Sequence, residues 1–220
     1  MENLAELLGE MVLPRRLEKI LRVLDQRLAG VRAVAENLHH PHNMSAVLRS
    51  SEALGVQHLH VVEEYDEFKV SRKITMGCHK WLTLHRHDDF GECARELKNL
   101  DFSLYAAVLS DRAVPVSEVP VDRPVALVFG NEMSGVSPSA REYCDGEFII
   151  PMGGFVQSFN VSVAAAVSLY DVTTRMKKRG GPGVFLTSEE KTALLAEWLP
   201  KSAPFAKRIT RIIKDRQERP

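Results

Sequence analysis

Apolar positions along the chain change their period several times, and each period predicts an element. From residue 13 to residue 30 they recur every three or four positions, with Pro14 in the first turn, which predicts a helix that ends at Gly30. The centre contains short, mostly apolar runs instead. We expect strands in these runs, at residues 31–35, 59–62, 81–85, 104–109, 125–129 and 147–151.

Helical patterns separate these runs. They lie at residues 44–54, 90–100 and 159–177, and the first of them starts after Asn43, a capping residue type, and stops before Gly55. Repeated strand-then-helix order is typical of an α/β fold with a mainly parallel sheet and helices on both faces. Two further helices are predicted at the end, over residues 187–199 and 205–219, and Thr187 with Glu190 forms a capping-box pattern.

Composition places the chain among soluble cytoplasmic proteins. Hydrophobic residues make up 45% and charged residues 26% of its 220 positions, and no apolar run reaches the roughly 20 residues that cross a bilayer. The first eleven residues contain three glutamates and no basic residue, unlike a secretory signal. Cys78, Cys93 and Cys144 are odd in number and far apart, which indicates reduced thiols.

The net charge is zero, but it is unevenly distributed. Residues 33–174 have a net charge of −8, and residues 175–220 have a net charge of +7. The basic ends suggest a phosphate-binding surface, and the alternative is a solvated helix face. The residues expected to contact RNA there are Arg15, Arg16, Lys19, Lys207, Arg208, Arg211 and Lys214.

Three segments contain residue types suited to chemistry. The first is H-H-P-H-N-M-S-A-V-L-R, residues 39–49. Asn43 is expected to cap the helix, and Arg49, six residues later, is expected to return to the side of Asn43, where the amide oxygen would orient the guanidinium. The alternative is an ordinary capped helix with a surface arginine.

The second segment is V-A-L-V-F-G-N-E-M-S-G, residues 125–135. A buried strand leads directly into Gly130, so Asn131 and Glu132 emerge at the carboxyl edge of the sheet, where open α/β sheets bind ligands. The alternative is a plain strand-to-helix turn.

The third segment is I-I-P-M-G-G-F-V-Q-S-F-N-V-S-V-A-A-A, residues 149–166. Gly153 and Gly154 give its loop backbone freedom, and Ser158 and Asn160 precede a helix of small residues. The loop lacks both the G-K-[ST] ending of a Walker A site and a G-x-G-x-x-G fingerprint, which argues against nucleotide hydrolysis and dinucleotide binding.

Together the segments resemble the SpoU branch of the SPOUT methyltransferases. N-x₅-R, then G-N-E-x-x-G, then I-P-M-x-G-x-x-x-S-x-N-V-S-V-A follow in that order within residues 31–180. The resemblance implies a methyltransferase domain at 31–180 between basic helical extensions at 1–30 and 181–220. With both extensions included, the chain resembles family members that 2′-O-methylate guanosine 18 in the tRNA D-loop.

The resemblance implies a C-terminal deep trefoil knot, a homodimer, tRNA as partner and S-adenosylmethionine as methyl donor. Arg49 would anchor the target ribose or its phosphate, since a guanidinium keeps its proton in proteins. Asn43 would orient Arg49, Glu132 would hold polar groups, and Ser158 with Asn160 would shape the donor pocket. By position the donor would lie against Ala107, Val108, Leu109, Gly130, Ile150, Met152, Ser158 and Phe159.

Other functions remain open from sequence alone. Another tRNA position or ribosomal RNA is the main alternative substrate, and a non-catalytic RNA-binding module on the same fold is an alternative of another class. No metal is expected, because the H-x-H patterns lack a cysteine or carboxylate at familiar ligand spacing. His58 and His60 are expected on the wetter face of a strand, and the cysteines are expected to be packing residues.

Overall fold

The computed structural model describes residues 12–63 and 77–202. The chain divides into two compact units. The larger unit is Leu28–Val184, and the smaller joins Met1–Arg27 to Phe185–Pro220. The predicted division at residues 30 and 180 stays a prediction about domains.

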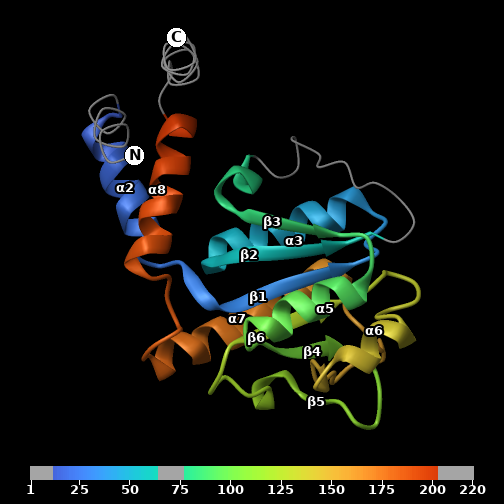
Figure 1. Cartoon of the computed structure of the whole chain (residues 1–220). Helices are drawn as coiled ribbons and strands as arrows, with labels where there is room; N and C mark the ends of the chain where they lie inside the picture. Colours follow the sequence, from blue (N-terminus) through green and yellow to red (C-terminus); the bar gives the residue numbers. More distant parts are fainter. Residues whose placement is uncertain (1–11, 64–76, 203–220) are drawn as a thin grey trace. The chain divides into compact units, whose positions relative to one another are not determined.

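A seven-stranded sheet runs through the larger unit in the order β3-β2-β1-β6-β4-β7-β5 (Figure 1). Every neighbouring pair is parallel, which confirms the predicted α/β class. The strands are β1 (Leu28–Glu36), β2 (Val56–Val62), β3 (Thr83–His87), β4 (Ser103–Ala107), β5 (Val114–Pro115), β6 (Val125–Phe129) and β7 (Gly146–Ile149).

Helices cover both faces of this sheet, as Figure 1 shows. Side chains alternate along each strand, so Leu127 of β6 enters one core and Val128 enters the other. The first core includes apolar residues of α3 and α7, and the second includes those of α5 and α6. The helical segments of this unit are α3 (Pro41–Leu54), α5 (Phe90–Asn99), α6 (Pro138–Tyr143), α7 (Val161–Arg179), η1 (Cys78–Trp81) and η2 (Val116–Glu118).

Local signals set several helix ends but not the start of α3. Asn160 caps α7 by accepting from the Ser162 N–H, and Gly55 ends α3 with a φ of 88°. The predicted cap at Asn43 is wrong, because α3 begins at Pro41 and its N-cap is His40. Proline has no N–H to leave unpaired in a first turn, so it extends the helix to position 41. This frees the Asn43 side chain for other partners.

The smaller unit contains α2 (Pro14–Leu24) and α8 (Ser188–Ser202). The capping box is confirmed: the Thr187 N–H donates to Glu190 Oε2 (2.7 Å), and the Glu190 N–H donates to Thr187 Oγ1 (3.2 Å). The predicted end of this helix at residue 199 is wrong, because α8 continues to Ser202 and contains Pro200.

The end of the first helix was also misplaced by the apolar pattern. The helix α2 stops at Leu24, so Gly30 lies in β1 and does not end a helix. A Cβ at Gly30 would lie 2.7 Å from the carbonyl oxygen of Gly183, so a close backbone approach explains this glycine.

The predicted helix at 205–219, with Lys207, Arg208, Arg211 and Lys214, lies outside the described residues. Among the helices that the structure does describe, none is both long and apolar enough to cross a bilayer.

Candidate active site

A cavity of about 530 Å³ opens at the carboxyl ends of three adjacent strands. Its wall comes from the segments that follow β4, β6 and β7, together with the start of α7. Because these strands are parallel neighbours, their following loops meet at one edge of the sheet. All eight residues predicted to hold the donor line this cavity: Ala107, Val108, Leu109, Gly130, Ile150, Met152, Ser158 and Phe159.

The turn after β6 requires a glycine at its first position. A Cβ at Gly130 would lie 2.2 Å from the carbonyl carbon of Gly135, which leaves no room for any side chain. Asn131 and Gly135 exchange backbone hydrogen bonds of 3.0 and 2.9 Å, and Gly135 has a φ of 70°. The Asn131 amide also donates to the carbonyl oxygen of Asn37 (2.9 Å). The turn is therefore fixed from both sides and presents Glu132 at the cavity.

A chain of polar side chains links three segments that are far apart in sequence. The Asn160 amide donates to Asn43 Oδ1 (3.2 Å), and the Asn43 amide donates to Glu132 Oε1 (2.8 Å). The Glu132 carboxylate also accepts the backbone N–H groups of His39 (3.3 Å) and His40 (3.2 Å). The start of α3, the turn after β6 and the cap of α7 are thus joined.

Hydrogen bonds keep Glu132 ionised. Burial acts to raise the pKa of its carboxyl group, but the hydrogen bonds from Asn43 and the backbone outweigh burial and lower that pKa below its usual range. At neutral pH the residue is a carboxylate that only accepts hydrogen bonds. It therefore fixes the direction of the Asn43 amide and leaves the Asn43 oxygen to accept from Asn160.

Arg49 is not brought to the cavity wall. It is exposed on α3, makes no hydrogen bond to any described residue and does not line the cavity. Among the described residues no hydrogen bond joins Asn43 to Arg49, and the Asn43 side chain bonds to Glu132 and Asn160 instead, so the orientation of Arg49 by Asn43 stays a prediction. A helix turns about 100° per residue, so six positions place the two side chains about 120° apart.

Sequence reasoning missed several residues of the cavity wall. Arg141, Gln157 and Ser168 line it. Arg141 donates to Glu147 (2.8 Å from Nε), and Ser110 also bonds to Glu147 and, with Arg141, lowers the pKa of that carboxyl group. Arg141 lies on the short helix α6 and belongs to none of the three motifs, so only the fold brings it to the cavity.

The glycine pair of the third segment is not needed for close packing among the described residues. A Cβ at Gly153 or Gly154 would meet no atom within 4 Å, and neither residue has a positive φ.

Comparison with known proteins agrees with these features. The model of the SpoU rRNA methylase family matches residues 30–170, which include Asn43, Glu132 and Asn160. The chain belongs to this family. Several full-length relatives named tRNA (guanosine(18)-2′-O)-methyltransferase are similar to it. The relative from Thermus thermophilus is 40% identical over 85% of this chain and 95% of its own length. The relative from Escherichia coli is 32% identical over 89% of this chain and 87% of its own length.

Solved structures of SpoU proteins share the fold. The Aquifex aeolicus TrmH/SpoU tRNA modifying enzyme superposes with a TM-score of 0.77 at 35% identity, over 85% of this chain and 96% of that one. The Streptomyces viridochromogenes SpoU methyltransferase AviRb, solved with AdoMet, has a TM-score of 0.63 at 24% identity, over 73% of this chain and 65% of that one. The fold of this chain is therefore that of the SpoU proteins.

Proposed function

We propose that this SpoU protein transfers a methyl group from S-adenosylmethionine to the 2′-hydroxyl of guanosine 18 in the tRNA D-loop. The observation that carries the proposal is the cavity, in which all eight predicted donor residues lie beside the Asn160–Asn43–Glu132 chain. The names of relatives that match most of the chain support the choice of substrate.

The cavity suits a donor of this size and chemistry. Its volume of about 530 Å³ lies within the range of small-molecule sites, about 300–1,000 Å³. Apolar walls from Leu109, Ile150 and Met152 fit a sulfonium that must lose its charge, and backbone groups at the strand ends offer polar contacts. These contacts are expected to hold the donor with its methyl group toward the ribose.

The chemical step is an in-line displacement. A lone pair of the ribose O2′ forms the new C–O bond while the methyl–sulfur bond breaks. The electrons of the broken bond stay on the sulfur and neutralise the sulfonium. The hydroxyl proton leaves to a substrate phosphate or a water molecule. The protein must align the two reactants, and this positioning is its main contribution to such a reaction. The rigid turn at Gly130 and the capped start of α7 serve this alignment.

Arg49 is proposed to anchor RNA phosphate and not to act as a base. Its exposure on α3 leaves all its N–H donors available to an incoming strand, and guanidinium groups bind phosphate in a bidentate manner. Ser158 and Asn160 are proposed to shape the donor pocket at the start of α7. The Asn43 amide, fixed by Glu132, is proposed to position the α7 cap.

Basic side chains outside the methylase unit are proposed to hold the tRNA backbone. Arg15, Arg16 and Lys19 line one hollow on the surface of α2. Lys207, Arg208, Arg211 and Lys214 are assigned the same role from the sequence alone. The protein is proposed to act in the cytoplasm, where tRNA is found and where its free cysteines stay reduced.

A homodimer is proposed through α7. Val163, Val167 and Tyr170 are 44%, 40% and 63% exposed, and their spacing of four and three residues forms an apolar stripe on one side of the helix. Phe155 and Phe159, also exposed, precede the same helix. Such a surface favours burial against a second copy. Tyr170→Glu should yield monomers in analytical ultracentrifugation, and an unchanged dimer would place the interface elsewhere.

The family's C-terminal trefoil knot is likewise proposed for this chain.

The decisive experiment supplies labelled S-adenosylmethionine and an unmodified tRNA transcript, then maps the methylated nucleotide. One methyl group per tRNA at guanosine 18 is expected. A matched transcript with 2′-deoxyguanosine at position 18 lacks the acceptor and should remain unlabelled. A ribosomal RNA fragment serves as the alternative substrate. Labelling of that fragment or of another tRNA position would replace the substrate assignment, and failure to bind the donor in calorimetry would indicate a non-catalytic module.

A further inference from the structure

Four histidines gather between the edge of the sheet and α5. His58 and His60 lie on β2, and His85 and His87 lie on the neighbouring edge strand β3. Alternate residues of a strand share one face, and the register pairs His60 with His85, so all four side chains lie on the same face. His60 is fully buried, so its expected place on a wetter face is wrong.

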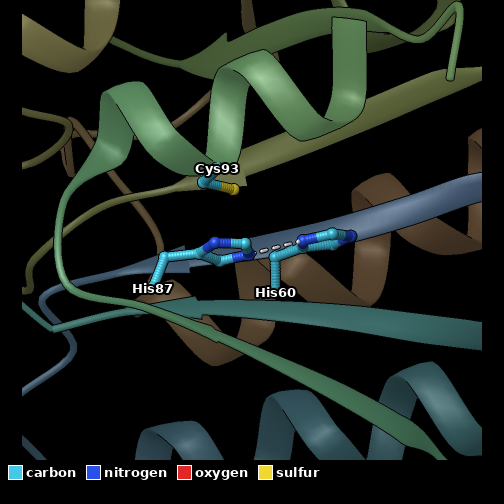
Figure 2. A group of neighbouring side chains, drawn as sticks. All are labelled: His60, His87 and Cys93. Atoms are coloured by element: carbon cyan, nitrogen blue, oxygen red, sulfur yellow. Dashed lines mark hydrogen bonds between the residues drawn. The ribbon is translucent and has the colours of Figure 1, made fainter. Parts of the chain in front are cut away.

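Helix α5 adds two more ligand-type side chains to this face. Cys93 and Glu96 are three residues apart and therefore lie on the same side of the helix. Nitrogens of His60 and His87 and the Cys93 sulfur all lie within 4.8 Å of one another, and all three residues are buried. Figure 2 shows the two imidazole rings side by side on the sheet, with Cys93 reaching toward them from the helix. Glu96 Oε2 lies 3.8 Å from His87 Nε2.

The hydrogen bonds of this cluster determine which ring nitrogens of His60 and His87 carry protons. The Arg32 guanidinium, which only donates, lies 3.1 Å from His60 Nε2, so the proton of neutral His60 is on Nδ1. That Nδ1 donates to His87 Nε2 (3.0 Å). The proton of neutral His87 is then on Nδ1, which is buried and has no hydrogen-bond partner in the described structure. An unpaired buried N–H group is costly, so the hydrogen bonds within the cluster do not fully satisfy the His87 ring.

Two charged side chains border the imidazole rings, Arg32 beside His60 and Glu96 beside His87. The carboxylate of Glu96 lies 3.8 Å from Arg32 Nη1 and offsets part of the positive charge in the cluster. A cation bound here would thus have both neutral nitrogens and an anionic oxygen beside it.

We propose that His60, His87 and Cys93 bind one zinc ion, with the Glu96 carboxylate as the fourth ligand. Two imidazole nitrogens, a thiolate and a carboxylate are a donor set that zinc takes in tetrahedral sites, and they disfavour magnesium and calcium. The site shares no residue with the donor cavity. It would tie β2 and the edge strand β3 to α5 and so stabilise this side of the methylase unit.

Zinc binding at this site displaces the proton of Cys93 and moves that of His60. The Cys93 thiol gives its proton to solvent and binds as thiolate. His87 Nε2 binds through the lone pair that otherwise accepts from His60. The His60 proton moves from Nδ1 to Nε2, and Arg32 turns from His60 toward the nearby Glu96. Three described elements supply the ligands, so spacing along the sequence does not reveal the set.

The test uses the full chain, stripped with a chelator and titrated with Zn²⁺ or Co²⁺. We expect one equivalent of either ion to bind and cobalt to give a thiolate-to-metal charge-transfer band. At a hundredfold excess over Kd, zinc should raise Tm by about 5–10 °C, and Mg²⁺ should not. Methyl transfer is not the readout, so the result is independent of the proposed function.

Two cysteine variants identify the ligand. Cys93→Ser should lose the cobalt band and the zinc-dependent rise in Tm, whereas Cys78→Ser, at another free cysteine, should keep both. The Cys78→Ser/Cys144→Ala double variant leaves Cys93 as the sole thiol and should retain the band even if Cys93→Ser fails to fold. Absence of stoichiometric binding, or of the band in the double variant, would overturn the proposal.

Discussion

The side-chain amide of Asn160 donates a hydrogen bond to the side-chain oxygen of Asn43, 117 positions earlier in the chain, at 3.2 Å. Asn160 caps α7, and Asn43 lies in the first turn of α3. Glu132 accepts from Asn43 and so fixes which end of that amide faces Asn160. The start of the two helices and the turn after β6 are therefore aligned beside the cavity.

The Asn43→Ala variant removes both of these hydrogen bonds. Because a hydrogen bond to a charged group contributes about 1.5–3 kcal/mol, the methyl-transfer rate should fall about ten- to a hundredfold. Asn99→Ala, at an exposed position that ends α5, is the matched control and should keep the wild-type rate. A single-turnover assay measures the rate, and Tm checks that each variant folds. A full rate in Asn43→Ala would show that the hydrogen bonds among Asn160, Asn43 and Glu132 do not serve catalysis.

The lowered pKa of Glu132 predicts a pH dependence of stability. The folded state stabilises the ionised form of Glu132, and this adds to the free energy of unfolding. The added stability is present above the unfolded pKa of 4.5 and is lost as pH falls through the lower folded pKa. Urea unfolding between about pH 5 and pH 3 should show a shallower loss of stability for Glu132→Gln than for the wild type. Glu118→Gln, at an exposed position, should follow the wild type. Parallel curves for all three proteins would contradict the prediction.

Two glycines of the site should respond differently to alanine. At Gly130 the new Cβ would lie 2.2 Å from backbone atoms of Gly135 and Val136, so Gly130→Ala should lower the free energy of unfolding by about 1–3 kcal/mol and weaken donor binding. At Gly153 no atom lies within 4 Å and φ is not positive, so Gly153→Ala should leave the stability unchanged or raise it by about 0.4–1 kcal/mol. Chemical denaturation measures both. Equal losses would show that Gly153 is constrained by a contact outside the described chain.

The basic hollow of α2 predicts a change in the salt dependence of tRNA binding. Each phosphate contact releases counterions, so replacing Arg15, Arg16 and Lys19 by alanine should reduce the log–log salt slope by up to about 3. Arg86→Ala removes one positive charge that is paired with Glu63 on the methylase unit and should leave the slope unchanged. Filter binding at several salt concentrations provides the slopes. An unaltered slope in the triple variant would remove α2 from the RNA-binding surface.

The sequence alone determined the local features of this protein. The five buried residues of β6 and the capping box at Thr187 were both predicted, because periodicity and capping depend on residues a few positions apart. The order and spacing of the motifs also identified the family, and the eight residues that the resemblance assigned to the donor all line the cavity. Errors fell where a second segment intervenes, as at Gly30, whose place in β1 reflects the backbone of Gly183.

The tertiary structure decided which of these residues meet. Strand order places the ends of β4, β6 and β7 side by side, and nothing local specifies that order. It turns Asn43 from a helix cap into the link between Glu132 and Asn160, and it leaves Arg49 on an exposed side of α3. It also gathers His60, His87 and Cys93 from two strands and a helix. Contacts between distant segments depend on how whole elements pack, and that information is not present in any short window of sequence.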